Sequence, residues 1–252
     1  VGGITQYFPS WNFSQTAKVI GPVDHVESAY VEGKSAGSLN IKTALLSLES
    51  EMQAAAVNGT RQRMPETQAL GGQLSIDLAR TQTETQAVVF GRKKKQDDLQ
   101  LNADRLKASG LNSLAVNTNA AIAVQSGQTI QVSPGGKVSL KGGEVNLDGN
   151  VIARSGEVEL QTHLVGNDDS ITGAIRLGEA SMIDTSGIWN NDRPAVSDRK
   201  DQFDASLVRI DGGKVSIKAE GDVDLTPGSF IDVSGAAHRL MDKSITAGDA
   251  GA

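Results

Sequence analysis

The chain lacks cysteine, has few aromatic residues and contains no long apolar run. None of its 252 residues is Cys, and Phe, Trp and Tyr together make up 4% of the sequence. The absence of Cys excludes disulfides and thiolate metal sites. No apolar run approaches the roughly 20 residues that a membrane-spanning helix needs, and the chain does not open with a basic and apolar leader. We therefore expect a piece of a longer polypeptide.

An excess of positive charge is missing too. The sequence has 24 Lys and Arg against 30 Asp and Glu, a formal net charge of −6. Because affinity for nucleic acid depends on clustered positive charge, this balance argues against a nucleic-acid partner. Glycine, in contrast, is abundant, with 28 residues. Many glycines and few rings favour a narrow fold with tight turns over a wide globular core.

One module occurs twice, at residues 135–156 and at 212–235. Each copy contains three short segments in which apolar and polar residues alternate. Turns that contain glycine, aspartate or proline separate them. A self-similar unit of about 21–24 residues that cannot bury its own apolar side chains indicates a solenoid, and the alternation makes it a β-solenoid. The aliphatic positions recur every seven residues in the first copy and every eight in the second: Val138, Val145 and Ile152, then Val215, Val223 and Ile231.

The alternation also predicts which side chains face inward, because successive residues of a strand point to opposite faces. One strand departs from the pattern. Counting from Ile152 would bring Arg154 inward, so we expect Val151 and Ala153 to be buried there instead. The other predicted inward residues are Val138, Leu140, Val145, Leu147, Val215, Ile217, Val223, Leu225, Ile231 and Val233.

The repeat predicts a β-solenoid over residues 36–237, with about nine layers spaced by about 4.8 Å. Residues 1–35, rich in aromatics, are expected to form an irregular segment that lies over the solenoid or ends a preceding region, and this segment or neighbouring sequence is expected to cover one end of the solenoid. Loop excursions are predicted near 58–70, 81–98 and 189–205, and an irregular tail over 238–252. Residues 106–110 are predicted to form one of the strands.

Two aspartates occupy equivalent places in a phrase that occurs at 181–187 and again, 48 residues later, at 229–235. At 21–24 residues a layer this spacing is two layers, which predicts that Asp184 and Asp232 lie about 9 to 10 Å apart. One hypothesis is paired acid–base chemistry, as in enzymes that cleave polysaccharides. The favoured interpretation is that these residues point to water and keep the layers soluble.

Other candidate sites are weaker. The basic run at 92–95 suggests docking of an acidic polymer, but Asp97 and Asp98 follow it, so a solvated loop tip is favoured. Residues 142–148 lack the third Gly of a calcium-binding β-roll repeat. His25, His163 and His238 are far apart and are predicted to be surface residues, and the glycan-acceptor patterns at Asn12 and Asn58 are common by chance. No residue is therefore assigned a catalytic, cofactor-binding or metal-binding role.

Four stretches carry a resemblance to a known family: 183–192, 211–217, 221–225 and 227–235. They resemble the rod region of filamentous-haemagglutinin-like exoproteins of Gram-negative bacteria, most clearly over 181–237. The resemblance implies a right-handed parallel β-helix, export through an outer-membrane transporter by the two-partner route, and display as an adhesive fibre. The family's secretion domain has no counterpart here, and its rods bring no catalytic residues or cofactors.

The leading functional hypothesis is a non-catalytic structural rod of a secreted or surface-displayed adhesin, with a host-cell or glycan receptor. Two alternatives stay open. The rod could be the stalk of a contact-dependent toxin, or the chain could be a polysaccharide-active β-helix enzyme with charged groups that converge in a groove. Fold-level analogy supports only the class of protein, not its receptor.

Overall fold

The computed structural model describes residues 3–9, 12–18, 29–59, 61–79, 86–92, 95–164, 171–192 and 207–252. The chain divides into two compact units, Val1–Val31 and Glu32–Ala252. The first unit contains an antiparallel hairpin of β1 (Gly3–Phe8) and β2 (Phe13–Lys18), where the sequence predicts irregular structure. Asn12 closes its turn with a φ of 45°, and its side chain accepts a hydrogen bond from the Tyr7 hydroxyl. That this segment covers an end of the sheets stays a prediction.

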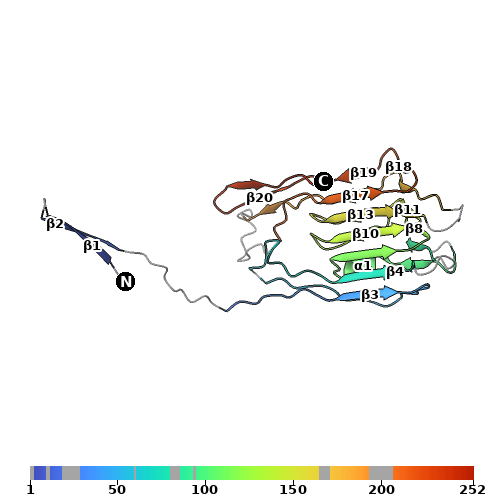
Figure 1. Ribbon diagram of the computed structural model, residues 1–252, viewed down its shortest axis with the longest axis horizontal. Coiled ribbons are helices and arrows are strands. Elements are labelled where there is room, and N and C mark those ends of the chain that lie inside the picture. Colours follow the sequence, from blue (N-terminus) through green and yellow to red (C-terminus); the bar gives the residue numbers. More distant parts are fainter. Residues whose placement is uncertain are drawn as a thin grey trace, which may run out of the picture. The chain divides into compact units, whose positions relative to one another are not determined.

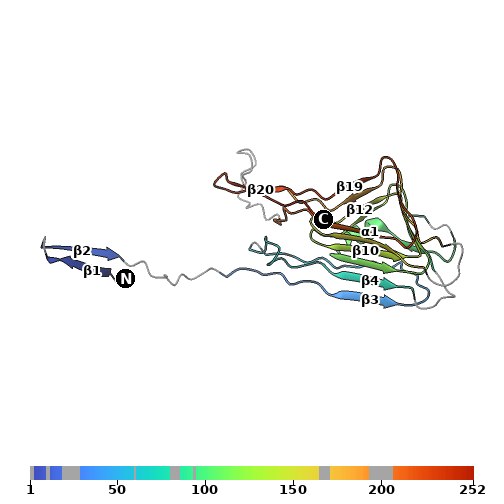
Figure 2. The same ribbon diagram turned by 45° about the horizontal axis from the view of Figure 1, so that its top comes forward.

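The second unit is nearly all β and is built on three parallel sheets (Figures 1 and 2). Sheet 1 contains β3 (Ser38–Lys42), β4 (Gln73–Asp77), β7 (Ser113–Asn117), β10 (Lys137–Gly142), β13 (Glu157–Thr162) and β17 (Lys214–Lys218). Sheet 2 contains β5 (Val88–Phe90), β6 (Leu99–Leu101), β8 (Ala121–Val124), β11 (Glu144–Leu147), β14 (Ile175–Leu177) and β18 (Val223–Leu225). Sheet 3 contains β9 (Thr129–Gln131), β12 (Asn150–Ile152), β15 (Met182–Asp184) and β19 (Phe230–Asp232).

The chain visits the three sheets in turn, so that each passage adds one layer. From β7 onward the order is sheet 1, sheet 2, sheet 3, and each new strand pairs in parallel with the strand of the preceding layer. Val138, for example, lies beside Leu114 of the layer before and Val158 of the layer after. Among the described residues, sheet 1 has six strands and therefore six layers, fewer than the nine that the sequence predicts.

The layers differ in length because excursions of different sizes interrupt them. Lys137 pairs with Ser113, 24 positions earlier, and Asn150 with Thr129, 21 positions earlier, as the repeat predicts. Elsewhere the spacing grows, to 57 positions between Glu157 and its partner Lys214. The expected 21–24 residues a layer thus describes the centre of the unit and not its ends.

The core consists of aliphatic side chains stacked layer on layer. Burial alternates along the strands, and in the central layers every predicted inward residue is fully buried, including Val138, Leu140, Val145 and Leu147. The predicted change of register on β12 is confirmed, because Val151 and Ala153 are both 0% exposed. Such stacking removes apolar surface from water between each pair of neighbouring layers.

Two local predictions are wrong. Val88–Phe90 lies within a predicted excursion but forms β5, a strand buried between β8 and β6. Residues 106–110 were expected to form a strand, but α1 (Ala103–Ala108) covers most of them. The side chain of Asn102 caps this helix by accepting the Arg105 N–H, and Leu106 turns into the core. A good N-cap followed by apolar residues three apart favours a helical turn over a strand.

The expected irregular tail contributes strands as well. β20 (Ala237–Arg239) pairs in parallel with β16 (Asn190–Asn191) and antiparallel with β21 (Ile245–Ala247). The predicted excursion at 189–205 thus begins with a strand, and most of it falls outside the described residues. Among the described residues, no helix is long and apolar enough to cross a membrane.

Candidate functional site

Segments distant in sequence meet beside β20, and this is where charged side chains gather. Residues 61–70, part of a predicted excursion, reach from the second layer to the last two layers. The Val208 N–H donates to the Arg63 carbonyl over 2.8 Å, and Arg209 Nε donates to Gln68 Oε1 over 2.7 Å. The excursion therefore ties the early layers to the late ones.

The centre of this region is a cluster of three charged or ionisable side chains, Arg63, Asp192 and His238. One Asp192 oxygen accepts a hydrogen bond from Arg63 at 2.6 Å, and the other lies 2.9 Å from His238 Nε2. Their side chains are only 21%, 16% and 13% exposed. Burial alone would raise the pKa of Asp192, but the hydrogen bonds from Arg63 and His238 outweigh it and lower the pKa below its ordinary value of 3.8.

Replacing Asp192 with Asn is expected to lower the free energy of unfolding at pH 7 by about 2 kcal/mol, because hydrogen bonds to a buried charge are lost. The wild-type carboxylate contributes its stability above the unfolded pKa and loses it as pH falls through the lower folded pKa. Urea unfolding between pH 7 and pH 2.5 should therefore show that the gap between the free energies of unfolding of wild type and Asp192→Asn closes below about pH 4. The exposed Asp97→Asn change is the control, and a gap that stays constant with pH would contradict the assignment.

A cavity of about 560 Å³ lies beside the cluster. Burial lowers the pKa of Arg209 at its wall, and Glu66 opposes this shift. The His238 side chain at the wall of this cavity lies 2.9 Å from Asp192. This contact and that of Arg63 with Asp192 connect the segment around Arg63 with β20 and with the end of β16. The cavity is lined by Met64, Pro65, Glu66, Ser155, Val208, Arg209, Ile210, Asp211, Gly212, His238, Leu240 and Thr246.

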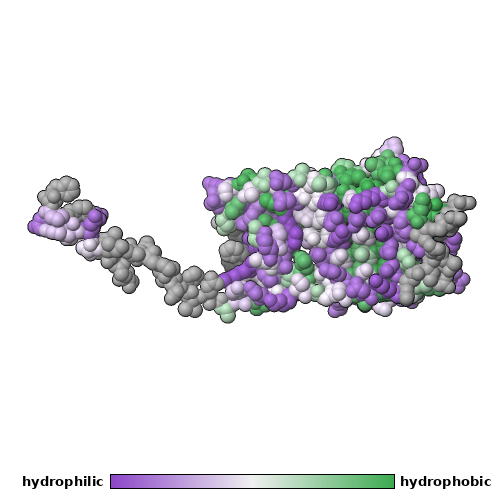
Figure 3. All heavy atoms as spheres, viewed as in Figure 1, coloured by the Kyte–Doolittle hydropathy of each residue, from purple (hydrophilic) through white to green (hydrophobic). Residues whose placement is uncertain are grey.

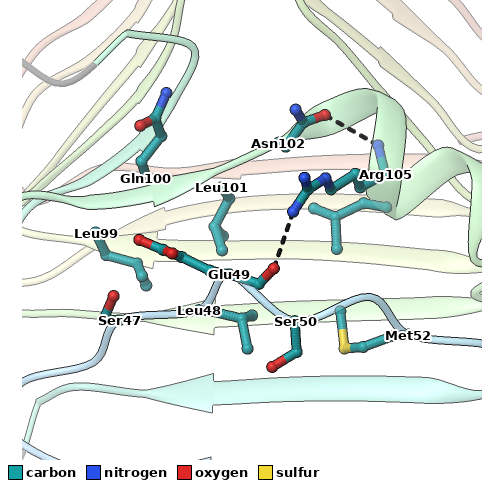
Figure 4. A pocket seen from close by; sticks show the side chains of 11 residues that line it. Ser47, Leu48, Glu49, Ser50, Met52, Leu99, Gln100, Leu101, Asn102 and Arg105 are labelled. Carbon is teal, nitrogen blue, oxygen red and sulfur yellow. Dashed lines mark hydrogen bonds between the residues drawn. The ribbon is translucent and has the colours of Figure 1, made fainter.

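A smaller cavity of about 340 Å³ lies between residues 47–52 and the strand and helix formed by 99–106 (Figure 4). The Arg105 side chain donates to the Glu49 carbonyl across it at 2.9 Å. Leu48 and Met52 pack against the core. This cavity separates the first layer from β6 and α1, and no carboxylate pair converges in it.

Asp184 and Asp232 lie closer together than the sequence predicts. They are Cα partners on adjacent strands β15 and β19, one layer apart and not two, because this layer is about twice as long as the 21–24 residues that the sequence predicts. Asp184 Oδ1 accepts the Ser186 N–H at 2.9 Å, and Asp232 Oδ1 accepts the Ser234 N–H at 2.9 Å.

The same two carboxylates are therefore occupied in closing turns. Hydrogen bonds from the side chain and backbone of Ser234 lower the pKa of Asp232, and Arg154 lies 3.4 Å from Asp184. An Asp that binds the backbone two residues on forms an Asx turn. The recurring Ile-Asp-x-Ser-Gly motif thus forms the same turn after β15 and after β19.

The remaining candidates give no site. His163 is half-buried, hydrogen-bonded to Asn119 at 3.0 Å, and its pKa is lowered by burial. The prediction of surface histidines is thus wrong for His163 and His238, and His25 lies outside the described residues. The side-chain amide of Asn58 bonds the backbone of Ala69 in both directions, which occupies its nitrogen.

Two further candidates end without support. In the basic run, residues 93–94 lie outside the described part of the chain, and Arg92 is exposed. Within that described part, no group of three or more His, Cys, Asp or Glu side chains is placed to hold a metal ion. The structure therefore gives no support to a calcium site at 142–148.

Comparison with known proteins adds no relative: no protein-family model, no curated protein and no solved structure matches this chain.

Proposed function

We propose that the second unit is a right-handed parallel β-helix. The cyclic order of β7 to β15 through three parallel sheets supports this, since each set of three strands makes one turn of a coil. Connections between parallel strands of one sheet are right-handed in about 98% of cases. The repeated Asx turns after β15 and β19 support a coil whose corners are set by short sequence signals.

We propose further that the chain is a non-catalytic structural rod segment of a secreted or surface-displayed bacterial adhesin, similar to filamentous haemagglutinin. The observation that carries the proposal is that the most conspicuous carboxylates, Asp184 and Asp232, are bound into turns. The resemblance of the turn phrases to that rod family supports the same function. In the full-length protein, an outer-membrane two-partner transporter would be the export partner, and a host-cell or glycan molecule the receptor.

The proposal predicts adhesion without cleavage. Purified chain coupled to beads should bind host cells or an arrayed glycan panel, and should release no reducing ends from acidic or neutral polysaccharides. The variant Asp184→Asn/Asp232→Asn should bind as the wild type does, because the Asn side-chain oxygen can accept the same turn hydrogen bonds. Polysaccharide cleavage by the wild type that this variant loses would refute the proposal and establish the enzyme. Failure of the beads to bind any cell or glycan would refute the adhesive part.

A further inference from the structure

The cavity of about 560 Å³ beside β20 has the composition of a small-molecule site. Three segments that are distant in sequence form it, residues 64–66, 208–212 and 238–246, together with Ser155. Its volume lies within the range of about 300 to 1,000 Å³ that is usual for ligand sites. Figure 3 shows polar and apolar surface side by side in the region where Figure 1 places β20. Such a wall suits a ligand that is itself partly apolar and partly polar.

Arg209 is a cation that its surroundings hold in place at the wall of this cavity. Its Nε donates to Gln68 Oε1 at 2.7 Å, and Gln68 is itself buried. Gly135 makes room for the guanidinium group, because an added Cβ there would overlap Cζ and Nη1 of Arg209. The bond to Gln68 uses one of the five N–H donors of a guanidinium. A cation fixed in this way is preorganised to bind an anion through its other donors.

The charges around the cavity favour an anion with a single charge. Two carboxylates, Glu66 and Asp211, also line the wall, but both residues are exposed, so water and salt screen them. Arg209 is half-buried, and burial lowers its pKa because the cation is poorly hydrated there. Its attraction for an anion is therefore screened less than the repulsion from the two carboxylates. A ligand carboxylate, with one charge and two oxygens that match the guanidinium fork, fits better than a doubly charged phosphate.

The other wall groups suit a ligand rich in hydroxyls. His238 and Thr246 are Cα partners on β20 and β21, so their side chains lie on the same face of that sheet, and both line the cavity. The Thr246 hydroxyl can donate or accept a hydrogen bond, and the two wall carboxylates can accept hydrogen bonds from hydroxyl groups. Met64 and Leu240 add apolar surface against which the C–H groups of a sugar ring can pack.

We propose that this cavity binds a sugar that carries a single carboxylate, with the carboxylate on Arg209 and the hydroxyls on the other polar wall groups. Uronic acids and N-acetylneuraminic acid are sugars of this class. The inference rests on the proposed adhesive function, because it names the chemistry of a glycan receptor. It also gives the excursion at residues 61–70 a role, since this segment provides both Gln68, which holds Arg209, and one wall of the cavity.

The test measures binding of free monosaccharides to the full 252-residue chain by two-dimensional NMR of its amide groups. Glucuronic acid and N-acetylneuraminic acid are the probes. Glucose is the matched uncharged ligand, because it has a CH₂OH group where glucuronic acid has its carboxylate, and acetate tests for binding of a bare carboxylate. At least one acidic sugar is expected to shift the amide signals of residues 238–246 and to bind about tenfold more tightly than glucose or acetate.

Arg209→Gln is expected to weaken binding of the acidic sugar about tenfold, because the charge-assisted hydrogen bonds are lost. Arg176→Gln is the matched control: it removes the same charge from an exposed position on the outer face of sheet 2 and should bind as the wild type does. Glu66→Gln, also at an exposed position, is expected to bind about twofold more tightly, because a repelling charge is removed. The same spectra show whether each variant is folded, and Glu66→Gln decides the question if Arg209→Gln is not.

The proposal would be overturned if neither acidic sugar bound at about 20 mM, or if folded Arg209→Gln bound them as tightly as the wild type does. Binding of glucose or acetate as tight as that of the acidic sugars would overturn it too. Cell adhesion is a separate measurement. Beads that bind host cells, while the chain binds neither acidic sugar, would refute this site and leave the adhesive function in place. Sugar binding without cell adhesion would keep the site and refute adhesion to cells.

Discussion

Gly156→Ala is expected to destabilise the protein by about 3 kcal/mol, although it adds a single methyl group. Gly156 follows the turn that leads into β13, directly above Gly136 of the preceding layer and below Gly213 of the next. A Cβ on Gly156 would overlap the carbonyl oxygen of Gly136. That oxygen accepts the Glu157 N–H at 2.8 Å, so it cannot move aside without breaking the ladder between layers. The backbone itself must separate, because no flexible side chain is there to yield.

Gly37 provides the matched control. It precedes β3 at the same corner, in the first layer, and an added Cβ would meet nothing within 4 Å. Gly37→Ala is therefore expected to leave stability unchanged or to raise it by up to about 1 kcal/mol through the unfolded state. Urea unfolding followed by circular dichroism gives both free energies. Equal effects at the two positions would show that overlap with the neighbouring layer is not what destabilises Gly156→Ala.

The alternation of residues within strands could be predicted from the sequence where the layers are regular. Val138 and Leu140 alternate with polar residues, and the structure buries them as predicted. The prediction was wrong for Val88–Phe90 because a buried strand of three residues has too few positions to show a period, and the charged residues around it indicated a loop. The distance between Asp184 and Asp232 was wrong because layer length was assumed constant, and nothing local signals an excursion within a layer.

The cluster of Arg63, Asp192 and His238 could not be predicted from the sequence. Arg63 and Asp192 are 129 positions apart, and each sits in a segment without strand or helix periodicity. One signal was readable: Asp and Ser two positions apart recur at Asp184, Asp232 and Asp242, and each pair forms the same local hydrogen bond. Turn chemistry of this kind is local and can be predicted. Contacts between excursions depend on how the layers stack, and so they appear only in three dimensions.

Leu140→Ala is expected to cost about 3 to 4 kcal/mol, the second large effect. Leu140 is fully buried in β10, between Val116 of the layer before and Leu160 of the layer after. Truncating it removes apolar contacts with both neighbours and leaves a cavity that β-sheet pairing prevents from collapsing. Because the stability of stacked layers is a sum over neighbouring pairs, one central residue weakens two interfaces at once.

Leu225→Ala is the control at the end of the stack. Leu225 has the same side chain but is 51% exposed and packs against only one layer, so its truncation is expected to cost less than about 1 kcal/mol. Both free energies come from urea unfolding. A Leu225→Ala effect as large as that of Leu140→Ala would mean that the last layer is covered in solution. The difference in free energy of unfolding between the two variants thus measures how much less the side chains of the last layer are buried than those of the central layers.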